Sequence, residues 1–346
     1  YAKAKELFEE RISQGIFIED KQSAYYIYQL EMNGRTQTGV VACASIDDYR
    51  NNVIKKHENT RAEKEQDRIR HVDTCNAQTG PIFLAYRSQA TINQLVSKIM
   101  ETQEPLYDFT AADGIAHRMW KVTEEAVTTL QEAFAGIQEI YIADGHHRAA
   151  SAVKVGLKRR KEHPDYDGTE EFNYFLSVLF PDNQLMIMDY NRCVKDLHGL
   201  TKEAFLKAVE ECFDVTVLDG AKHPQAKGQI TMYLENRWYL LQAKQELLAI
   251  TDPVAALDVS LLQEYLLKPV LGIEDPRTDE RIDFIGGIRG LEELERRVQT
   301  DMTVAFAMYP TSIGELFAVA DAGLLMPPKS TWFEPKLRSG LLMHRI

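Results

Sequence analysis

The stretch Glu139-Ile-Tyr-Ile-Ala-Asp-Gly-His-His-Arg-Ala-Ala-Ser-Ala152 predicts the local fold and is the best indication of function in the chain. Its apolar residues from Ile140 to Ala143 predict a short strand, Asp144-Gly145 a tight turn, and the small residues from Ala149 onward a helix. A helix start leaves backbone N–H groups without helical partners and carries the positive end of the helix dipole. Because anions, phosphates above all, bind at such a position, the stretch predicts an anion site between a strand and a helix.

Three polar residues, His146, His147 and Arg148, follow the turn and bring hydrogen-bond donors and positive charge to the helix start. In one interpretation the histidines are surface caps of a structural turn. In the other the turn binds a phosphate or carboxylate: Gly145 allows close backbone approach, Arg148 binds the anion in bidentate fashion, and Asp144 holds Mg²⁺ or a histidine. A zinc site is disfavoured, because no third ligand is obvious and adjacent histidines rarely share one metal.

A second charged motif lies upstream, where Lys55-Lys56-His57-Glu58 precedes Arg61, Glu65 and Arg68. The last three residues share one face of a helix at three- and four-residue spacing. The motif is therefore either a solvated, salt-bridged helix or a site in which Glu58, just before the helix, is a general base. It is not the zinc-protease signature, because Arg61 stands where the second histidine would be.

The third candidate is the segment from Pro327 to Phe333, which contains Lys329-Ser330-Thr331. Lys-Ser-Thr resembles the end of a phosphate loop, but the glycines of that loop are absent, so we reject this interpretation. The alternative that the segment is an ordered loop with Lys329 near a ligand is kept. Arg192 follows a strand end, where sites are often built, although a structural ion pair is the favoured role. The candidate ligand contacts outside the turn are His57, Arg61, Arg68, Arg192, Lys329, Ser330 and Thr331.

The composition describes a folded globular protein of 346 residues, 45% of them hydrophobic, which is long enough for two lobes. The net charge of −12 argues against a general nucleic-acid binder, which needs a basic face. No apolar run approaches the roughly 20 residues that cross a bilayer, and no signal peptide is visible. The four cysteines form no Cys-x-x-Cys pair, so we expect reduced thiols and a cytoplasmic protein.

Local patterns predict a mixture of hairpins and helices, and hence an α+β or mixed α/β fold. Asn33-Gly34 separates two runs rich in Tyr, Ile and Val and predicts a β-hairpin. Thr60 with Glu63 fits a capping box at a helix start. We expect a boundary near residue 190, with both charged motifs in a lobe of residues 1–190 and a second α/β lobe of residues 191–346, which ends in an irregular tail from Pro327.

The motifs together resemble a known family. Lys56 to Arg68, Thr79-Gly80-Pro81, Asp144 to Arg148 and Pro327 to Phe333 match the bacterial and archaeal family catalogued as domain of unknown function family 1015, over nearly the whole chain. That family usually has a further N-terminal segment. Since this chain opens with Tyr1 inside an expected helix, we expect such a segment upstream.

The Asp-Gly-His-His-Arg element is also similar to one in free-serine kinases of the ParB/sulfiredoxin superfamily. This resemblance implies a ParB/sulfiredoxin-like core with insertions, ATP or ADP as phosphate donor, Mg²⁺ and L-serine as acceptor. It implies that Gly145, His146, His147 and Arg148 hold the nucleotide phosphates, with Asp144 and His147 in the catalytic set. His57-Glu58 matches the stretch in which those kinases carry their base.

Two alternatives belong to other classes. One is a ParB-like nucleotide-binding regulator or DNA-associated switch without kinase activity, and the acidic net charge opposes its DNA part. The other is thiol chemistry of the sulfiredoxin kind. It needs a cysteine at the phosphate turn, and none lies between Cys75 and Cys193. A homodimer is compatible with the sequence.

Overall fold

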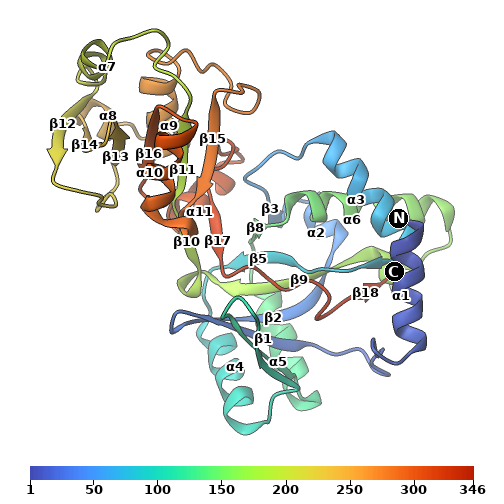
Figure 1. Cartoon of the computed structure of the whole chain (residues 1–346). Coiled ribbons are helices and arrows are strands. Elements are labelled where there is room, and N and C mark those ends of the chain that lie inside the picture. Colours follow the sequence, from blue (N-terminus) through green and yellow to red (C-terminus); the bar gives the residue numbers. More distant parts are fainter. The chain divides into compact units, whose positions relative to one another are not determined.

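A computed structural model describes all 346 residues and divides them into two compact units. The first unit contains Tyr1–Leu185 and Pro335–Ile346, and the second contains Met186–Glu334. The expected division at residue 190 left the last twelve residues in the second lobe, whereas the structure returns them to the first unit. Pairing of β18 (His344–Arg345) with β4 (Ala77–Gln78) holds this tail there, a long-range contact without a local sequence signal. Both units combine helices with sheets, so the α+β prediction is confirmed (Figure 1).

An eight-stranded mixed sheet forms the centre of the first unit. Its strands, in sheet order, are β3 (Ile54–Lys55), β8 (Ile140–Asp144), β5 (Ile82–Tyr86), β9 (Tyr174–Pro181), β2 (Arg35–Ser45), β1 (Tyr26–Met32), β7 (Ala116–Lys121) and β6 (Tyr107–Thr110). The predicted hairpin is confirmed: Met32 pairs with Arg35 across Asn33 and Gly34, whose φ angles of 52° and 75° are those the tight turn requires. β3 and β8 are parallel neighbours, which matters for the site.

Six α-helices accompany this sheet. They are α1 (Ala2–Ser13), α2 (Ile46–Arg50), α3 (Ala62–Cys75), α4 (Ala90–Thr102), α5 (Glu124–Ala135) and α6 (His146–Glu162). Helices α3 and α6 pack together, as do α4 and α5. Two short 3-10 turns, η1 (Glu171–Asn173) and η2 (Asp182–Gln184), flank β9.

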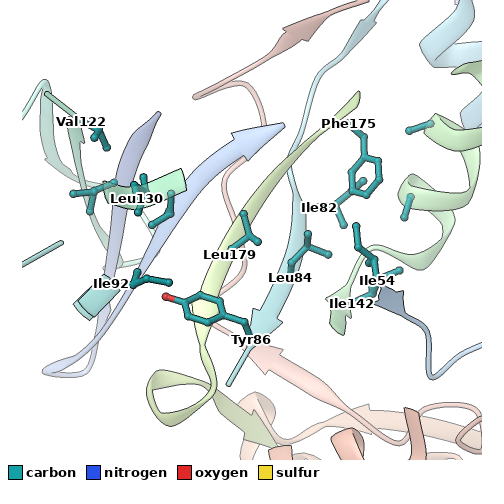
Figure 2. Packing of buried hydrophobic residues seen from close by; sticks show 14 of the residues in the cluster. Ile54, Ile82, Leu84, Tyr86, Ile92, Val122, Leu130, Ile142, Phe175 and Leu179 are labelled. Atoms are coloured by element: carbon teal, nitrogen blue, oxygen red, sulfur yellow. The ribbon is translucent and has the colours of Figure 1, made fainter. Parts of the chain in front are cut away.

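The apolar core of the first unit joins one face of the sheet to helices α2, α4, α5 and α6 (Figure 2). Ile54, Leu84 and Ile142 come from three adjacent strands and are almost fully buried. Burying such a side chain stabilises the fold by about 1.5–3 kcal/mol. Gly156 lets α6 approach closely, since a Cβ there would lie 2.4 Å from the carbonyl oxygen of Phe172. The core therefore fixes α6, and with it the turn at its start.

The capping box predicted at Thr60 is wrong. Helix α3 begins at Ala62 with Arg61 as its N-cap and no side-chain cap. The Thr60 hydroxyl instead donates to the Glu65 carboxylate at 2.7 Å, and Glu65 also pairs with Lys154 of α6. Packing of α3 on α6 buries Glu65, and the buried carboxylate takes the hydroxyl that would otherwise cap the helix.

The second unit has a six-stranded antiparallel sheet and a two-stranded one. The strands of the larger sheet, in order, are β12 (Phe213–Leu218), β14 (Arg237–Ala243), β13 (Gln229–Leu234), β16 (Val304–Met308), β11 (Tyr190–Val194) and β15 (Ile282–Gly286). The smaller sheet pairs β10 (Met186–Met188) with β17 (Trp332–Glu334). The tail expected to be irregular from Pro327 thus contains β17 and, further on, β18.

Helices complete the second unit. They are α7 (Lys202–Val209), α8 (Gln245–Leu248), α9 (Asp258–Leu262), α10 (Gly290–Thr300) and α11 (Ile313–Asp321), with a π-helical turn η3 (Gln263–Leu267) and a 3-10 turn η4 (Gly287–Arg289). No helix in the chain is both long enough and apolar enough to cross a membrane. All four cysteines are unpaired thiols.

Candidate active site

A bulge and a tight turn at the end of β8 set the positions of Asp144 and Gly145. Phe83 of β5 pairs with Asp144 while Leu84 pairs with Ile142, so a bulge lies just before the turn and redirects the chain there. Gly145 has a φ of 101° and is the N-cap of α6, with no side chain capping the helix start. This positive φ requires glycine here, and a Cβ on Gly145 would also lie 3.0 Å from Arg148 Nε, so the guanidinium would have to shift.

The topology of the sheet explains why Glu58 lies near this turn. Strands β3 and β8 are parallel neighbours, with Lys55 paired with Tyr141. Parallel neighbours end at the same sheet edge, where ligand sites of α/β proteins are commonly built. His57 and Glu58 leave that edge directly after β3, and the segment from Gly145 leaves it after β8. The two charged motifs, far apart in the sequence, therefore meet.

His57, Glu58 and His146 form one contact chain. The backbone N–H of His57 donates to His146 Nε2 at 3.4 Å, and the two imidazole rings meet edge to face with centroids 4.4 Å apart. His146 Nδ1 lies 3.8 Å from Glu58 Oε2. Because Nε2 accepts a hydrogen bond, the proton of a neutral His146 belongs on Nδ1, on the side of the Glu58 carboxylate.

Burial keeps both of these histidines neutral. His57 is 2% exposed and His146 5% exposed. Burial lowers the pKa of His57 to about 4, against an opposing effect of Asp144. It also lowers the pKa of His146 well below the usual value, and His57 adds to the effect. His146 thus points into the protein toward Glu58.

His147 lies on the more accessible side of the helix start. Its Nε2 accepts the backbone N–H of Arg61 at 3.0 Å, which fastens the segment before α3 to the start of α6. Partial burial, and then Lys64, lowers the pKa of His147. The Ser151 hydroxyl donates to the His147 carbonyl at 2.6 Å and so closes the first turn of the helix.

Arg148 joins the turn to the Thr79-Gly80-Pro81 motif. Its Nη1 donates to the Pro81 carbonyl, and its Nη2 donates to Asp144 Oδ2 at 3.2 Å. Burial lowers the pKa of Arg148 while Asp144 opposes that effect. A guanidinium has more N–H donors than these two bonds use, so Arg148 can hold the turn and still donate to an anion.

Further cations surround this turn in a chain whose net charge is −12. Arg61, Lys64 and Arg68 are exposed on or just before α3 and act electrostatically on His147. Arg68 also acts on Arg148. The helix start, the glycine and these cations together form a local positively charged surface, the kind of surface that suits an anion.

One cation at the turn was missed by sequence reasoning. Lys336, in the tail that returns from the second unit, has its Nζ 3.9 Å from Asp144 Oδ2. No local pattern identifies this lysine, because only the path of the tail brings it to Asp144.

The predicted contacts in the second unit have internal roles. Arg192 is 3% exposed and donates to the backbone carbonyls of Tyr190 and, at 3.0 Å, Lys329, while its guanidinium lies 5.4 Å from the Phe284 ring centroid. Burial lowers its pKa to about 9. The expected ion pair of Arg192 is absent, because backbone carbonyls and an aromatic ring take the place of a carboxylate.

The loop beside Arg192 uses its own polar atoms in the same way. The Ser330 hydroxyl donates to the Pro327 carbonyl at 2.7 Å, and the Ser330 carbonyl accepts the Thr311 hydroxyl at 2.9 Å. Lys329 Nζ lies 5.5 Å from the Tyr190 ring centroid, and Thr331 is half-buried. These bonds give the loop its shape.

Metal ligands are sparse. No group of three or more His, Cys, Asp or Glu side chains is placed to hold a metal ion. A protein-only metal cage is therefore not built into the chain. The residues do fit Mg²⁺ carried by a nucleotide, because such an ion is commonly held by one or two carboxylates plus substrate phosphates. Asp144 is the carboxylate at the turn.

Comparisons with known proteins give a family match. The model of a family described as "Protein of unknown function (DUF1015)" matches residues 1–260. No curated protein matches the chain.

Several solved structures are similar at low sequence identity. A mutant free serine kinase in complex with AMP has 14% identity and a TM-score of 0.43, over 85% of this chain and 87% of that one. A second mutant of a free serine kinase, in complex with ADP, gives the same figures. SbnI with a C-terminal truncation, from Staphylococcus aureus, has 11% identity and a TM-score of 0.48, over 88% of this chain and 87% of that one.

Proposed function

The chain belongs to the DUF1015 family, whose function is described as unknown. From the geometry of the site we propose that the protein is a nucleotide-dependent phosphotransferase, which transfers phosphate from ATP or ADP to free L-serine. One observation carries the proposal. Glu58 Oε2 lies 3.8 Å from His146 Nδ1. His146 is the first residue of α6, the helix that has Gly145 as its N-cap and Arg148 in its first turn. A carboxylate base and an anion-binding helix start thus share one sheet edge.

Phosphate binding rests on the helix start. Gly145 allows a phosphate close to the backbone, and the helix dipole favours its charge. Arg148 donates from the side, and Arg61 and Arg68 add positive charge that attracts the nucleotide. Mg²⁺ held by Asp144 would neutralise charge on the phosphate oxygens.

Glu58 would accept the proton of the acceptor hydroxyl. Its side chain is 44% exposed, so a small substrate can reach the carboxylate. The Nδ1–H of neutral His146 lies on the side of the Glu58 carboxylate and can orient it. His147 acts as a positioning residue, because its hydrogen bond from Arg61 fastens the segment that follows Glu58 to the helix start.

The proposed step is balanced. The serine hydroxyl oxygen forms a bond to the terminal phosphorus, and the bond between that phosphorus and the bridging oxygen of the nucleotide breaks. The hydroxyl proton passes to Glu58, and the nucleotide leaves one phosphate shorter. Enzymes catalyse such a transfer mainly by positioning and charge neutralisation. The motif similarity to free-serine kinases makes L-serine the first acceptor to test.

The test is a direct product assay. The full-length protein is incubated with Mg²⁺, L-serine and either ATP or ADP, and phosphoserine is followed by phosphorus NMR. We expect phosphoserine with at least one donor and a much slower formation of phosphoserine with Glu58→Gln. Nucleotide binding without product from either donor would contradict the kinase assignment and favour a nucleotide-binding regulator.

A further inference from the structure

The C-terminal tail, Pro335–Ile346, lies against the first unit along much of its length (Figure 1). The Pro335 carbonyl accepts from Gln37 Nε2 at 3.4 Å, and the Gly340 N–H donates to the Thr79 carbonyl at 3.0 Å. Beyond these contacts β18 pairs with β4, and Arg345 forms an ion pair with Glu19 at 2.8 Å. The stretch between Pro335 and Gly340 is therefore held at both ends.

That stretch runs beside the Asp144 turn. Lys336 Nζ lies 3.9 Å from Asp144 Oδ2, the same oxygen that accepts from Arg148 Nη2 at 3.2 Å. Three residues further on, Ser339 packs against Gly80, where an added Cβ would lie 3.0 Å from Ser339 Oγ and 3.8 Å from Arg148 Nη1. The tail, the Thr79-Gly80-Pro81 motif and the turn thus meet around Arg148.

From this arrangement we propose that the tail completes the nucleotide site and that Lys336 is a phosphate-binding residue for the terminal phosphates of a nucleoside di- or triphosphate. The inference rests on the proposed function and deepens it. It assigns a binding role to a residue outside the region matched by the family model, which ends at residue 260.

Charge and geometry support this role. Two cations, Lys336 and Arg148, both lie beside the carboxylate of Asp144, so positive charge from two segments of the chain meets at the turn. The Lys336 side chain is 44% exposed, and its contact with Asp144 is long for an ion pair. Exposed pairs of this kind are weak, so Lys336 can turn toward a phosphate that carries more charge than one carboxylate. Lysine is a flexible point charge suited to phosphate.

The position of Lys336 at Asp144 also predicts which nucleotides depend on it. Asp144 is the carboxylate that would hold Mg²⁺ carried by the nucleotide, where the ion would neutralise charge on the terminal phosphates. Lys336 would therefore contact those phosphates and not the single phosphate of AMP. Removing it should weaken binding of ADP and leave AMP binding nearly unchanged.

The experiment measures dissociation constants of ADP and AMP by calorimetry, in the presence of Mg²⁺, for the full chain and three variants. Lys336→Ala should weaken ADP binding by about 10- to 100-fold, as for a lost hydrogen bond to a charged group, with AMP binding within about twofold of wild type. Lys336→Arg should restore most of the ADP affinity. Arg345→Ala, which removes a tail ion pair outside the Asp144 cluster, is the matched control and should bind both nucleotides as wild type does.

Three results would overturn the inference. The first is wild-type ADP affinity in Lys336→Ala. The second is an equal loss for AMP and ADP, which would mean that the lysine supports the tail and not the phosphates. The third is a wild-type protein that binds neither nucleotide, which overturns the proposed function as well. If the wild type forms phosphoserine and Lys336→Ala keeps the wild-type ADP affinity, only the role of Lys336 is contradicted and the proposed function stands.

Discussion

Two segments with similar sequence signals, the Asp144–Arg148 turn of the first unit and the Pro327–Thr331 loop of the second, have opposite polar environments. At the turn, charged groups arrive from other segments: Glu58 follows β3, and Lys336 comes from the tail. In the loop, the Ser330 hydroxyl bonds to a backbone carbonyl, and the Lys329 carbonyl accepts from the guanidinium of Arg192 in the neighbouring strand β11. Half-exposed charges that converge indicate a binding site, whereas polar groups satisfied by the backbone around them indicate a structural loop.

The strongest test of this difference is Glu58→Gln, which keeps the shape of the side chain and removes the base. We expect phosphoserine formation to fall by about 10²- to 10⁴-fold, the range for loss of a general base, with ADP affinity unchanged. Glu63→Gln, at an exposed glutamate in the first turn of α3, is the matched control. Full activity in Glu58→Gln would remove Glu58 from the mechanism.

Arg148→Ala should have the next largest effect. It removes a charge clamp and should cost about 2–4 kcal/mol of transition-state stabilisation, seen in kcat/KM for serine. Thermal unfolding must be measured beside it, because the variant also loses the bond to the Pro81 carbonyl. Arg70→Ala, at an exposed arginine of α3, should keep wild-type kinetics. An Arg148→Ala enzyme as fast as wild type would contradict the phosphate-binding role.

Acid should destabilise the region of the turn through its buried histidines. The folded-state pKa of His57 is lowered to about 4, below the roughly 6.5 of an unfolded histidine. Between these values the unfolded chain binds the proton that the folded chain excludes, so stability falls as the pH drops from about 6.5 toward 4. The full loss from His57 is on the order of 3 kcal/mol.

Urea unfolding of wild type and His57→Gln at several pH values measures this effect. We expect the variant to show a shallower loss of stability than wild type across the window from pH 6.5 to 4. His223→Gln, at an exposed histidine, should follow the wild-type curve. Parallel curves for His57→Gln and wild type would show that His57 does not titrate as its burial requires.

Arg192→Ala tests the opposite expectation for the loop. Loss of the buried guanidinium leaves the Tyr190 and Lys329 carbonyls without this donor and should reduce the free energy of unfolding by about 1–3 kcal/mol. ADP affinity should stay as in wild type. Arg289→Ala, at an exposed arginine of the same unit, controls for the charge. A large loss of ADP affinity without loss of stability would make Arg192 a ligand contact after all.

The smallest effect is expected for Lys329→Ala. Its Nζ lies 5.5 Å from the Tyr190 ring centroid in an exposed setting, so the change should cost about 0.5–1 kcal/mol of stability. ADP affinity should change by less than about twofold, in contrast to Lys336→Ala. Equal losses of ADP affinity in the two variants would remove the distinction between turn and loop.

Several features of the fold could be predicted from the sequence, because interactions between residues close together in the chain determine them. The strand Ile140–Asp144, the glycine of positive φ and the helix from His146 are set by apolar pattern, turn chemistry and helix propensity. The β1–β2 hairpin forms around Asn33-Gly34 for the same reason. Thr60 is the counterexample, because its hydroxyl bonds to Glu65, a residue that becomes buried only when α3 packs on α6.

By itself, then, the sequence determined the helix start that we propose for anion binding and its neighbouring charges, because glycine conformation and the helix dipole act over a few residues. Only the tertiary structure decided which charges serve that site. The parallel pairing of β3 with β8 brought Glu58 to His146 and turned that histidine inward. The return of the tail brought Lys336 to Asp144, and burial bound Arg192 to carbonyls. These contacts join distant segments, so they depend on sheet order and packing and not on any residue pattern along the chain.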